Sequence, residues 1–211
     1  LSDLARGKLA TTPDARLGWM IVVGTLPIVV CGLLFKEHIE TTLRSLYVMS
    51  AALAGVAALL ALAEWAIARR RAAGVEGREL DQAIWLDAIV VGVAQAAALV
   101  PGTSRSGATI LGGLCTGLTR EAAARFSFLL SIPAVLAAGV FQLIDARSEL
   151  LASGQHAMKL LAALVVTAIV GYATIPWLLG FLRHRTMFIF IVYRVLLAGL
   201  LLFLLATGRI A

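Results

Sequence analysis

Charged side chains are scarce in this chain. Of its 211 residues, 14% are Asp, Glu, Lys or Arg, whereas 61% are hydrophobic and the mean hydropathy is +0.95. Soluble globular proteins carry about 25% charged residues, and a chain this apolar has too few polar side chains to cover a surface in water. The composition excludes a cytosolic enzyme, a disordered tail and a nucleic-acid-binding module. It indicates an all-α, polytopic membrane protein.

Cysteine is also scarce. The two cysteines, Cys31 and Cys115, lie in apolar stretches and are not spaced as metal ligands, so we interpret them as buried free thiols. The three histidines show no metal-ligand spacing either. The residues of this chain therefore predict no metal site of their own.

Five apolar stretches are long enough, or nearly so, to cross a bilayer, which takes about 20 residues per helix. They are residues 17–35, 46–66, 126–144, 160–181 and 187–206. We expect five spanning helices in a single integral membrane domain, residues 1–211. The net charge of +6 is explained by basic residues in cytoplasmic loops, and this tendency places the arginines at 69–71 in the cytoplasm.

The stretch from residue 83 to residue 118 is apolar but interrupted. The interruption is the loop Pro101-Gly102-Thr103-Ser104-Arg105-Ser106-Gly107, and the half that follows it, residues 108–118, is too short to span a membrane alone. Lipid cannot satisfy the polar groups of such a loop, and broken helices at membrane depth line cavities and often bind ligands. We predict a re-entrant helix–loop–helix over residues 83–118, which places the C-terminal end outside.

The loop has the chemistry of an anion site. Its glycines let the backbone approach a ligand closely, its hydroxyls can donate hydrogen bonds, and Arg105 offers a planar fork that matches phosphate oxygens. The start of the second half-helix adds free N–H groups. The alternative is that the small residues only pack helices and the arginine reaches the headgroups. Because an arginine at mid-membrane costs about 2.5–3.5 kcal/mol, we favour a phosphate site.

Two further polar residues lie in apolar segments. Arg194, in the last span, either contacts the same ligand, binds backbone carbonyls of the broken helix, or pairs with Glu64 or Asp87. Gln95, before the loop, is expected to hydrogen-bond between helices.

The loop and the residues Ala108, Thr109 and Ile110 after it resemble the undecaprenyl-diphosphate phosphatase family of bacterial inner membranes. The similarity continues through Gly117-Leu118-Thr119-Arg120, residues 126–133 and Tyr193-Arg194. It implies hydrolysis of undecaprenyl diphosphate to the monophosphate, which recycles the lipid carrier for cell-wall synthesis, and an association with bacitracin resistance. It also implies an inverted repeat with two re-entrant hairpins around a cavity open to the periplasm. The partners implied are a polyprenyl diphosphate lipid and the bilayer, and a homodimer stays open.

The resemblance also implies roles for single residues. The catalytic residues would be Arg105, Ser104 and Ser106, with Arg105 neutralising charge on the transferred phosphoryl group. The substrate-binding residues would be Gly102, Thr103, Gly107, Thr109, Arg194 and Gln95. A divalent cation, Mg²⁺ or Ca²⁺, is expected from the resemblance, with no ligands in this chain.

One family motif, a pair of glutamates four residues apart followed by a Ser-Ser-x-Gly-His stretch, is not found here. The chain begins with Leu1 rather than methionine, so we expect it to be the later part of a longer protein and to be inactive, or nearly so, by itself. The main rival function is a transporter or flippase of an anionic polyprenyl phosphate lipid, since broken helices are also a transporter feature. A third is a structural scaffold in which Arg105 only packs.

Overall fold

The computed structural model describes residues 12–147 and 154–210, and this part of the chain contains helices and loops but no strand. The five helices that are long and apolar enough to cross a membrane confirm the five predicted spans. They are α2 (Pro13–Leu34), α4 (Leu46–Ala72), α7 (Arg120–Asp145), α9 (Gly154–His184) and α10 (Phe188–Ala206). The all-α, polytopic fold class is thereby confirmed. The ends of the expected domain, residues 1–11 and 211, lie outside the described residues, as do residues 148–153.

Several of these helices begin where a side chain caps the free amides of the first turn. Thr12 precedes α2 and accepts a hydrogen bond from the Ala15 amide, and Ser45 does the same for Tyr47 at the start of α4. Thr119 accepts from the Ala122 amide before α7. The positions of these hydroxyls in the sequence therefore determine where the three helices begin.

Two short helices form the interrupted segment: α5 (Trp85–Ala97) and α6 (Arg105–Cys115). The second begins earlier than expected, because Ser104 rather than a later residue provides the cap, so that Arg105, Ser106 and Gly107 belong to its first turn. The loop between the helices is correspondingly short, residues 98–104. Short connecting helices complete the chain: α3 (Lys36–Glu40), η1 (Thr42–Arg44) and η2 (Leu80–Gln82).

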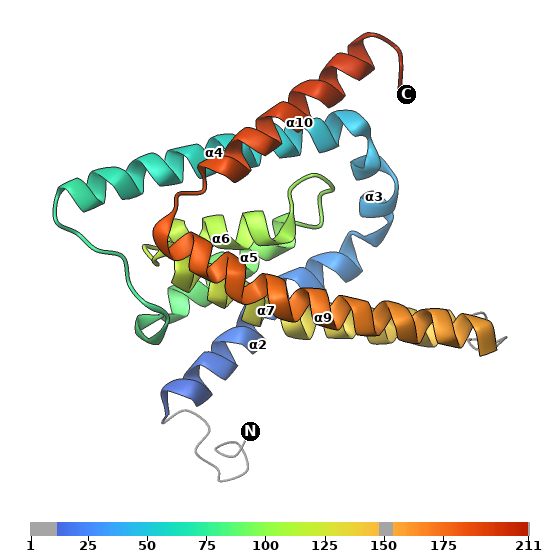
Figure 1. Ribbon diagram of the computed structural model, residues 1–211, viewed down its shortest axis with the longest axis horizontal. Helices are drawn as coiled ribbons and strands as arrows, with labels where there is room; N and C mark the ends of the chain where they lie inside the picture. Colours follow the sequence, from blue (N-terminus) through green and yellow to red (C-terminus); the bar gives the residue numbers. More distant parts are fainter. Residues whose placement is uncertain (1–11, 148–153, 211) are drawn as a thin grey trace.

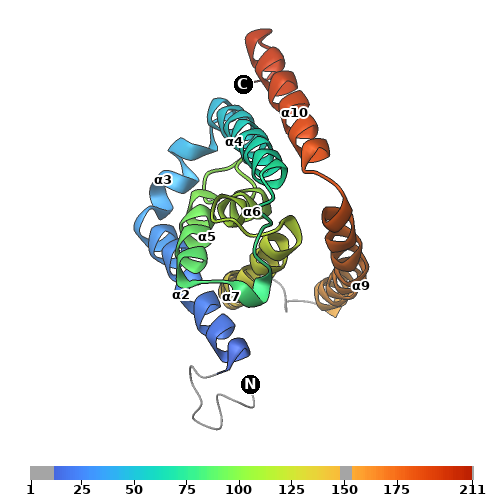
Figure 2. The same cartoon turned by 90° about the vertical axis from the view of Figure 1, so that its left-hand side faces the viewer.

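The helix–loop–helix lies in the middle of the molecule. In Figure 1, α5 and α6 lie between the crossing pair α4 and α10 on one side and α2, α7 and α9 on the other. Figure 2 shows α2, α4 and α7 around these two short helices, with α9 and α10 along one side. The long helices thus surround the short pair that carries the polar loop.

Two hydrophobic clusters hold the short helices in place. One joins α6 to α4, α7 and α10 and includes Leu60, Leu114 and Ala122. The other joins α5 to α2 and α7 through Val91, Met20 and other apolar side chains. Where α2 and α5 cross, Gly92 lies so close to the backbone of Gly24 that a larger residue would not fit. The backbone approach between these helices therefore depends on small residues.

Large apolar side chains cover the outside of the long helices. Leu33, Leu136, Ile169 and Leu196 are all well exposed, as expected for a surface in contact with lipid rather than water. The structure thus confirms a multi-pass membrane protein.

Candidate functional site

The tip of the helix–loop–helix is fixed against α4 by its backbone. Gly102 has a φ of +91°, and the backbone of Met49 lies where a side chain at residue 102 would have to be. Glycine is required there on both counts. Ser104 follows with a φ of +63°, the only positive φ at a non-glycine position among the described residues. Its hydroxyl accepts a hydrogen bond from the Gly107 amide and caps α6.

Arg105 lies directly after this cap, with a serine on each side. The hydroxyl oxygens of Ser104 and Ser106 are 3.5 Å apart, and both serines are exposed. The Arg105 side chain is half-buried, and its guanidinium has no hydrogen bond or ion pair with any residue that the structure describes. An arginine in such a position can bind an anion without first breaking a contact within the protein.

Arg194 supplies a second cation beside the same turn. The residue is 8% exposed, its Nη1 donates to the Thr103 carbonyl at 3.0 Å, and its guanidinium packs against Gly107. The interpretation that Arg194 binds a carbonyl of the broken helix is confirmed. The alternative, an ion pair with Glu64 or Asp87, is wrong.

Those two carboxylates have other partners, because other arginines lie closer. Glu64 on α4 pairs with Arg120, at 2.8 Å from the Arg120 Nε, and its Oε1 also accepts from the Met187 amide at 3.0 Å. This pair joins α4, α7 and the start of α10. Asp87 pairs with Arg78.

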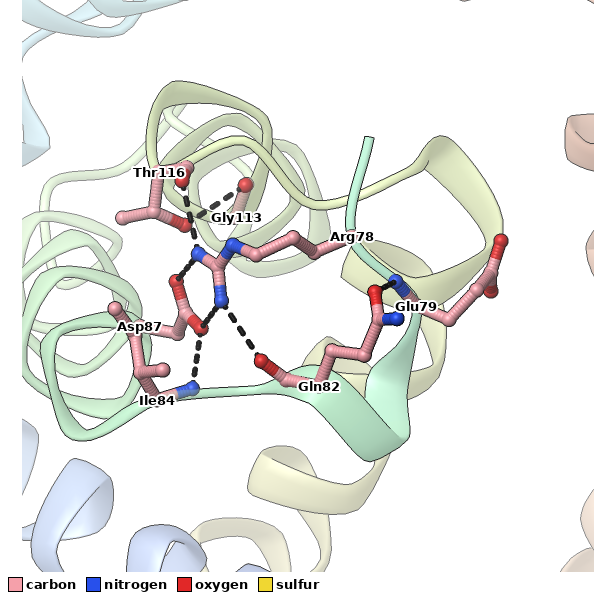
Figure 3. Close-up of polar contacts among 7 residues, drawn as sticks. All are labelled: Arg78, Glu79, Gln82, Ile84, Asp87, Gly113 and Thr116. Atoms are coloured by element: carbon pink, nitrogen blue, oxygen red, sulfur yellow. Dashed lines mark hydrogen bonds and ion pairs between the residues drawn. The ribbon is translucent and has the colours of Figure 1, made fainter. Parts of the chain in front are cut away.

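Arg78 lies at the open end of the helix–loop–helix, where α5 begins and α6 ends (Figure 3). Its Nη atoms donate to both carboxylate oxygens of Asp87, at 2.8 and 2.7 Å, and to the carbonyls of Gln82 and Thr116. Its backbone amide donates to the Gly117 carbonyl. The hydrogen bonds to the Asp87 carboxylate raise the pKa of the Arg78 guanidinium above its ordinary value. One side chain therefore links the start of α5 to the end of α6.

Two cavities border the first turn of α6. One has a volume of about 300 Å³, and its polar lining residues include Ser104, Ser106 and Arg194. Apolar side chains of α4, α9 and α10 form most of the rest of its wall. The other, of about 360 Å³, lies on the α7 side; its lining residues are Arg105, Ser106, Ser127, Phe128 and Ser131. Ser106 borders both. The first cavity combines cationic and hydroxyl groups with an apolar wall, which suits an amphiphile with an anionic head.

Thr109 lies behind this surface rather than on it. It is completely buried, and its hydroxyl is 2.8 Å from the Arg105 carbonyl and 2.5 Å from the Ser127 hydroxyl. Ser127 was not predicted as a site residue. As a hydroxyl within the span 126–144 it could have been noticed as a polar group that needs a partner in the membrane.

Gln95 lies on α5 and is completely buried. Neither atom of its amide group has a hydrogen-bond partner among the described residues, and Gln95 borders neither of the two cavities. The expected hydrogen bond between helices is therefore not seen at this residue.

The site offers few ligands for a divalent cation. The described residues contain no group of three or more His, Cys, Asp or Glu side chains that could hold a metal ion, and the carboxylates of Glu64 and Asp87 each bind an arginine. Hard divalent cations prefer carboxylate and carbonyl oxygens. The described residues therefore do not fit Mg²⁺ or Ca²⁺.

The fold and the site define a class: a multi-pass helical membrane protein with a loop rich in hydroxyls and an unpaired arginine at the tip of a broken helix. Comparison with known proteins gives the family. Residues 2–200 match the family of the bacitracin resistance protein BacA, and the chain belongs to this family. The resemblance deduced from the loop is confirmed.

The relatives are similar over all or nearly all of the chain. A protein of Chloroherpeton thalassium is 52% identical over 210 residues, which is 100% of this chain and 74% of the relative. A protein of Prosthecochloris aestuarii is 52% identical over 199 residues, 94% of this chain and 71% of its own length. A protein of Chlorobaculum tepidum is 49% identical over 210 residues, with 74% of its length covered. Each is named undecaprenyl-diphosphatase.

Proposed function

We propose that the protein hydrolyses undecaprenyl diphosphate to undecaprenyl monophosphate and inorganic phosphate. The names of its relatives support this activity over the rival transporter or flippase. The observation that carries the proposal is the unpaired guanidinium of Arg105, between two serine hydroxyls at the first turn of a central short helix.

The diphosphate binds at this turn. The hydroxyls of Ser104 and Ser106 donate to its oxygens, and the first amides of α6 point in the same direction, as at other helix N-termini that bind phosphate. Gly102, Thr103 and Gly107 keep the backbone compact enough for the headgroup to approach. Arg105 neutralises charge on the phosphoryl group that is transferred.

Arg194 binds the headgroup from the other side of the turn. Because it is largely buried, its interaction with a phosphate is less screened by water than that of a surface arginine. Thr109 and Gln95 are both completely buried, so they are assigned to the support of the site rather than to direct contact. A water molecule supplies the oxygen that replaces the broken P–O bond in the products.

The apolar wall of the first cavity receives the first isoprene units. Leu53, Leu182 and Phe190, from three different long helices, belong to this wall. The remainder of so long a chain extends into the lipid that surrounds the helices.

The active site opens to the periplasmic side of the bacterial inner membrane. The basic residues 69–71 at the end of α4 favour the cytoplasm for the open end of the helix–loop–helix. The tip, at Gly102, lies against Met49 near the opposite end of α4. The headgroup site is therefore directed away from the cytoplasm.

Phosphate release tests the proposal. The assay uses the full-length protein in micelles with undecaprenyl diphosphate. Arg105→Ala should lower kcat/KM by about 100-fold, as the loss of a charge-stabilising group does elsewhere. Arg105→Lys should recover part of it, since lysine keeps the charge but not the planar fork.

Arg71→Ala, at an exposed arginine of α4, is the control and should leave the rate within about twofold. Movement of the intact lipid across vesicles without phosphate release would overturn the proposal in favour of a transporter. Full activity of Arg105→Ala would favour the scaffold.

A further inference from the structure

Two buried hydroxyls connect α7 to the first turn of α6. The Ser127 hydroxyl lies 2.5 Å from the Thr109 hydroxyl, which in turn lies 2.8 Å from the carbonyl of Arg105 and 3.3 Å from that of Ser106. Ser127 is 3% exposed and Thr109 is completely buried. Water therefore does not compete for these contacts.

The direction of the hydrogen bonds follows from the donors available. A carbonyl can only accept, and a threonine hydroxyl has one hydrogen to give. The hydrogen of Thr109 therefore goes to the Arg105 carbonyl at 2.8 Å, and the hydrogen between the two hydroxyls comes from Ser127. Ser127 donates to Thr109, and Thr109 donates to the backbone of Arg105.

This chain of hydrogen bonds ends at Arg105, the residue with the unpaired guanidinium. The same helical turn also contacts Arg194 on its other face, through the Thr103 carbonyl and Gly107. The first turn of α6 is thus held by α7 through a hydroxyl chain and by α10 through an arginine. Ser127 also borders the cavity that is lined by Arg105 and Ser106, so the residue lies beside the site.

We propose that Ser127 is a positioning residue, which orients Arg105 for phosphoryl transfer by holding Thr109 against the Arg105 carbonyl. The inference rests on the proposed function. Alignment of a charge-stabilising group matters more in the transition state than in the bound substrate, and small displacements of such groups lower rates strongly. Loss of the Ser127 hydroxyl should therefore lower kcat and leave KM nearly unchanged.

The test compares kinetic constants of the full-length protein with undecaprenyl diphosphate. Ser127→Ala should lower kcat by about tenfold and change KM by less than about twofold. Ser127→Thr and Ser127→Val form a matched pair of nearly equal shape. Threonine keeps the hydroxyl, and the adjacent cavity can accommodate its extra methyl group, so Ser127→Thr should retain most of kcat whereas Ser127→Val should not.

A double-mutant comparison separates positioning from direct contact. If Ser127 acts only through Thr109, the double variant Ser127→Ala/Thr109→Val should have the kcat of Thr109→Val alone. Ser50→Ala is the control. Ser50 is also completely buried, but its hydroxyl donates to the Leu46 carbonyl within its own helix, and kcat should stay within about twofold.

The outcomes are distinct. A wild-type kcat for Ser127→Ala, equal losses for Ser127→Thr and Ser127→Val, or additive losses in the double variant would each overturn the positioning role while the proposed function stands. Absence of phosphate release by the wild-type protein would instead overturn the proposed function, and this inference with it.

Discussion

The guanidinium of Arg194 occupies the space that a side chain at Gly107 would need. The arginine comes from α10 and the glycine from the first turn of α6, so the two helices approach at this point only because residue 107 has no Cβ. Gly107→Ala would push Arg194 away from the Thr103 carbonyl to which it donates.

We expect Gly107→Ala to lower kcat/KM for phosphate release by about tenfold or more, because the displacement moves a cation of the site. Gly199→Ala in α10 is the matched control, since the space around Gly199 is open. It should leave the rate unchanged and favour the helix by about 0.5–1 kcal/mol. Equal rates for the two alanine variants would contradict the placement of Arg194.

The ion pair between Arg78 and Asp87 predicts unequal effects of removing its two members. The Asp87 side chain is completely buried, whereas that of Arg78 is 30% exposed. Arg78→Met leaves a buried carboxylate without its cation and should lower the free energy of unfolding by about 3 kcal/mol. Asp87→Asn leaves an arginine that can reach water, and should cost about 1 kcal/mol.

Unfolding by SDS titration, followed by circular dichroism, measures both changes. Arg71→Met, at an exposed position of α4, should change the free energy of unfolding by less than about 0.5 kcal/mol. If Asp87→Asn proves more costly than Arg78→Met, the burial difference does not govern this pair.

From the contacts of the Glu64 carboxylate we predict that three substitutions lower the free energy of unfolding by different amounts. Glu64→Leu leaves both Arg120 and the Met187 amide without their acceptor, and should lower the free energy of unfolding by about 3 kcal/mol. Glu64→Gln keeps a carbonyl oxygen for the Met187 amide and should lose about half as much. Glu121→Gln weakens the i,i+4 pair with the more exposed Arg125 and should cost no more than about 0.5 kcal/mol. The same SDS titration would contradict the series if all three losses were alike.

Cysteine labelling in intact cells tests the topology. A cysteine at Gly74, in the loop after α4, should resist a reagent that cannot cross the membrane, and one at Gly208, after α10, should react. The two native cysteines are free, but the prediction that they are buried is wrong, because Cys31 is half-buried and Cys115 is exposed. Both would be replaced by alanine first. If the segment 83–118 crossed the membrane once, Gly74 and Gly208 would lie on the same side and behave alike.

Helix positions followed from the sequence because they depend on local properties. The five spans needed only length and hydropathy, and the start of α7 needed only the hydroxyl of Thr119. The broken segment was recognisable from Pro101, Gly102 and the hydroxyls that follow. Its second helix was placed too late because Ser104, in an unusual backbone conformation, was not predicted as the cap.

The partners of charges within the apolar helices could not be deduced in the same way. Glu64 and Arg120 are 56 residues apart, and Thr103 and Arg194 are 91 residues apart. Hydropathy shows that each charge needs a partner but not which helix supplies it. Arg194 therefore stayed open between a carbonyl, a carboxylate and a ligand, and the contact of Ser127 with Thr109 was not predicted.

The backbone of Ser104 has a consequence for how a ligand is recognised. A positive φ costs a residue with a Cβ about 1–3 kcal/mol, a cost that glycine avoids. Glycine at this position would relax the turn but would remove the oxygen that receives the Gly107 amide. The chain thus keeps a serine with an unfavourable backbone conformation, and the geometry of this serine is fixed before a lipid binds. Conformational entropy lost during folding need not be lost again on binding, so the proposed headgroup site already has its binding geometry.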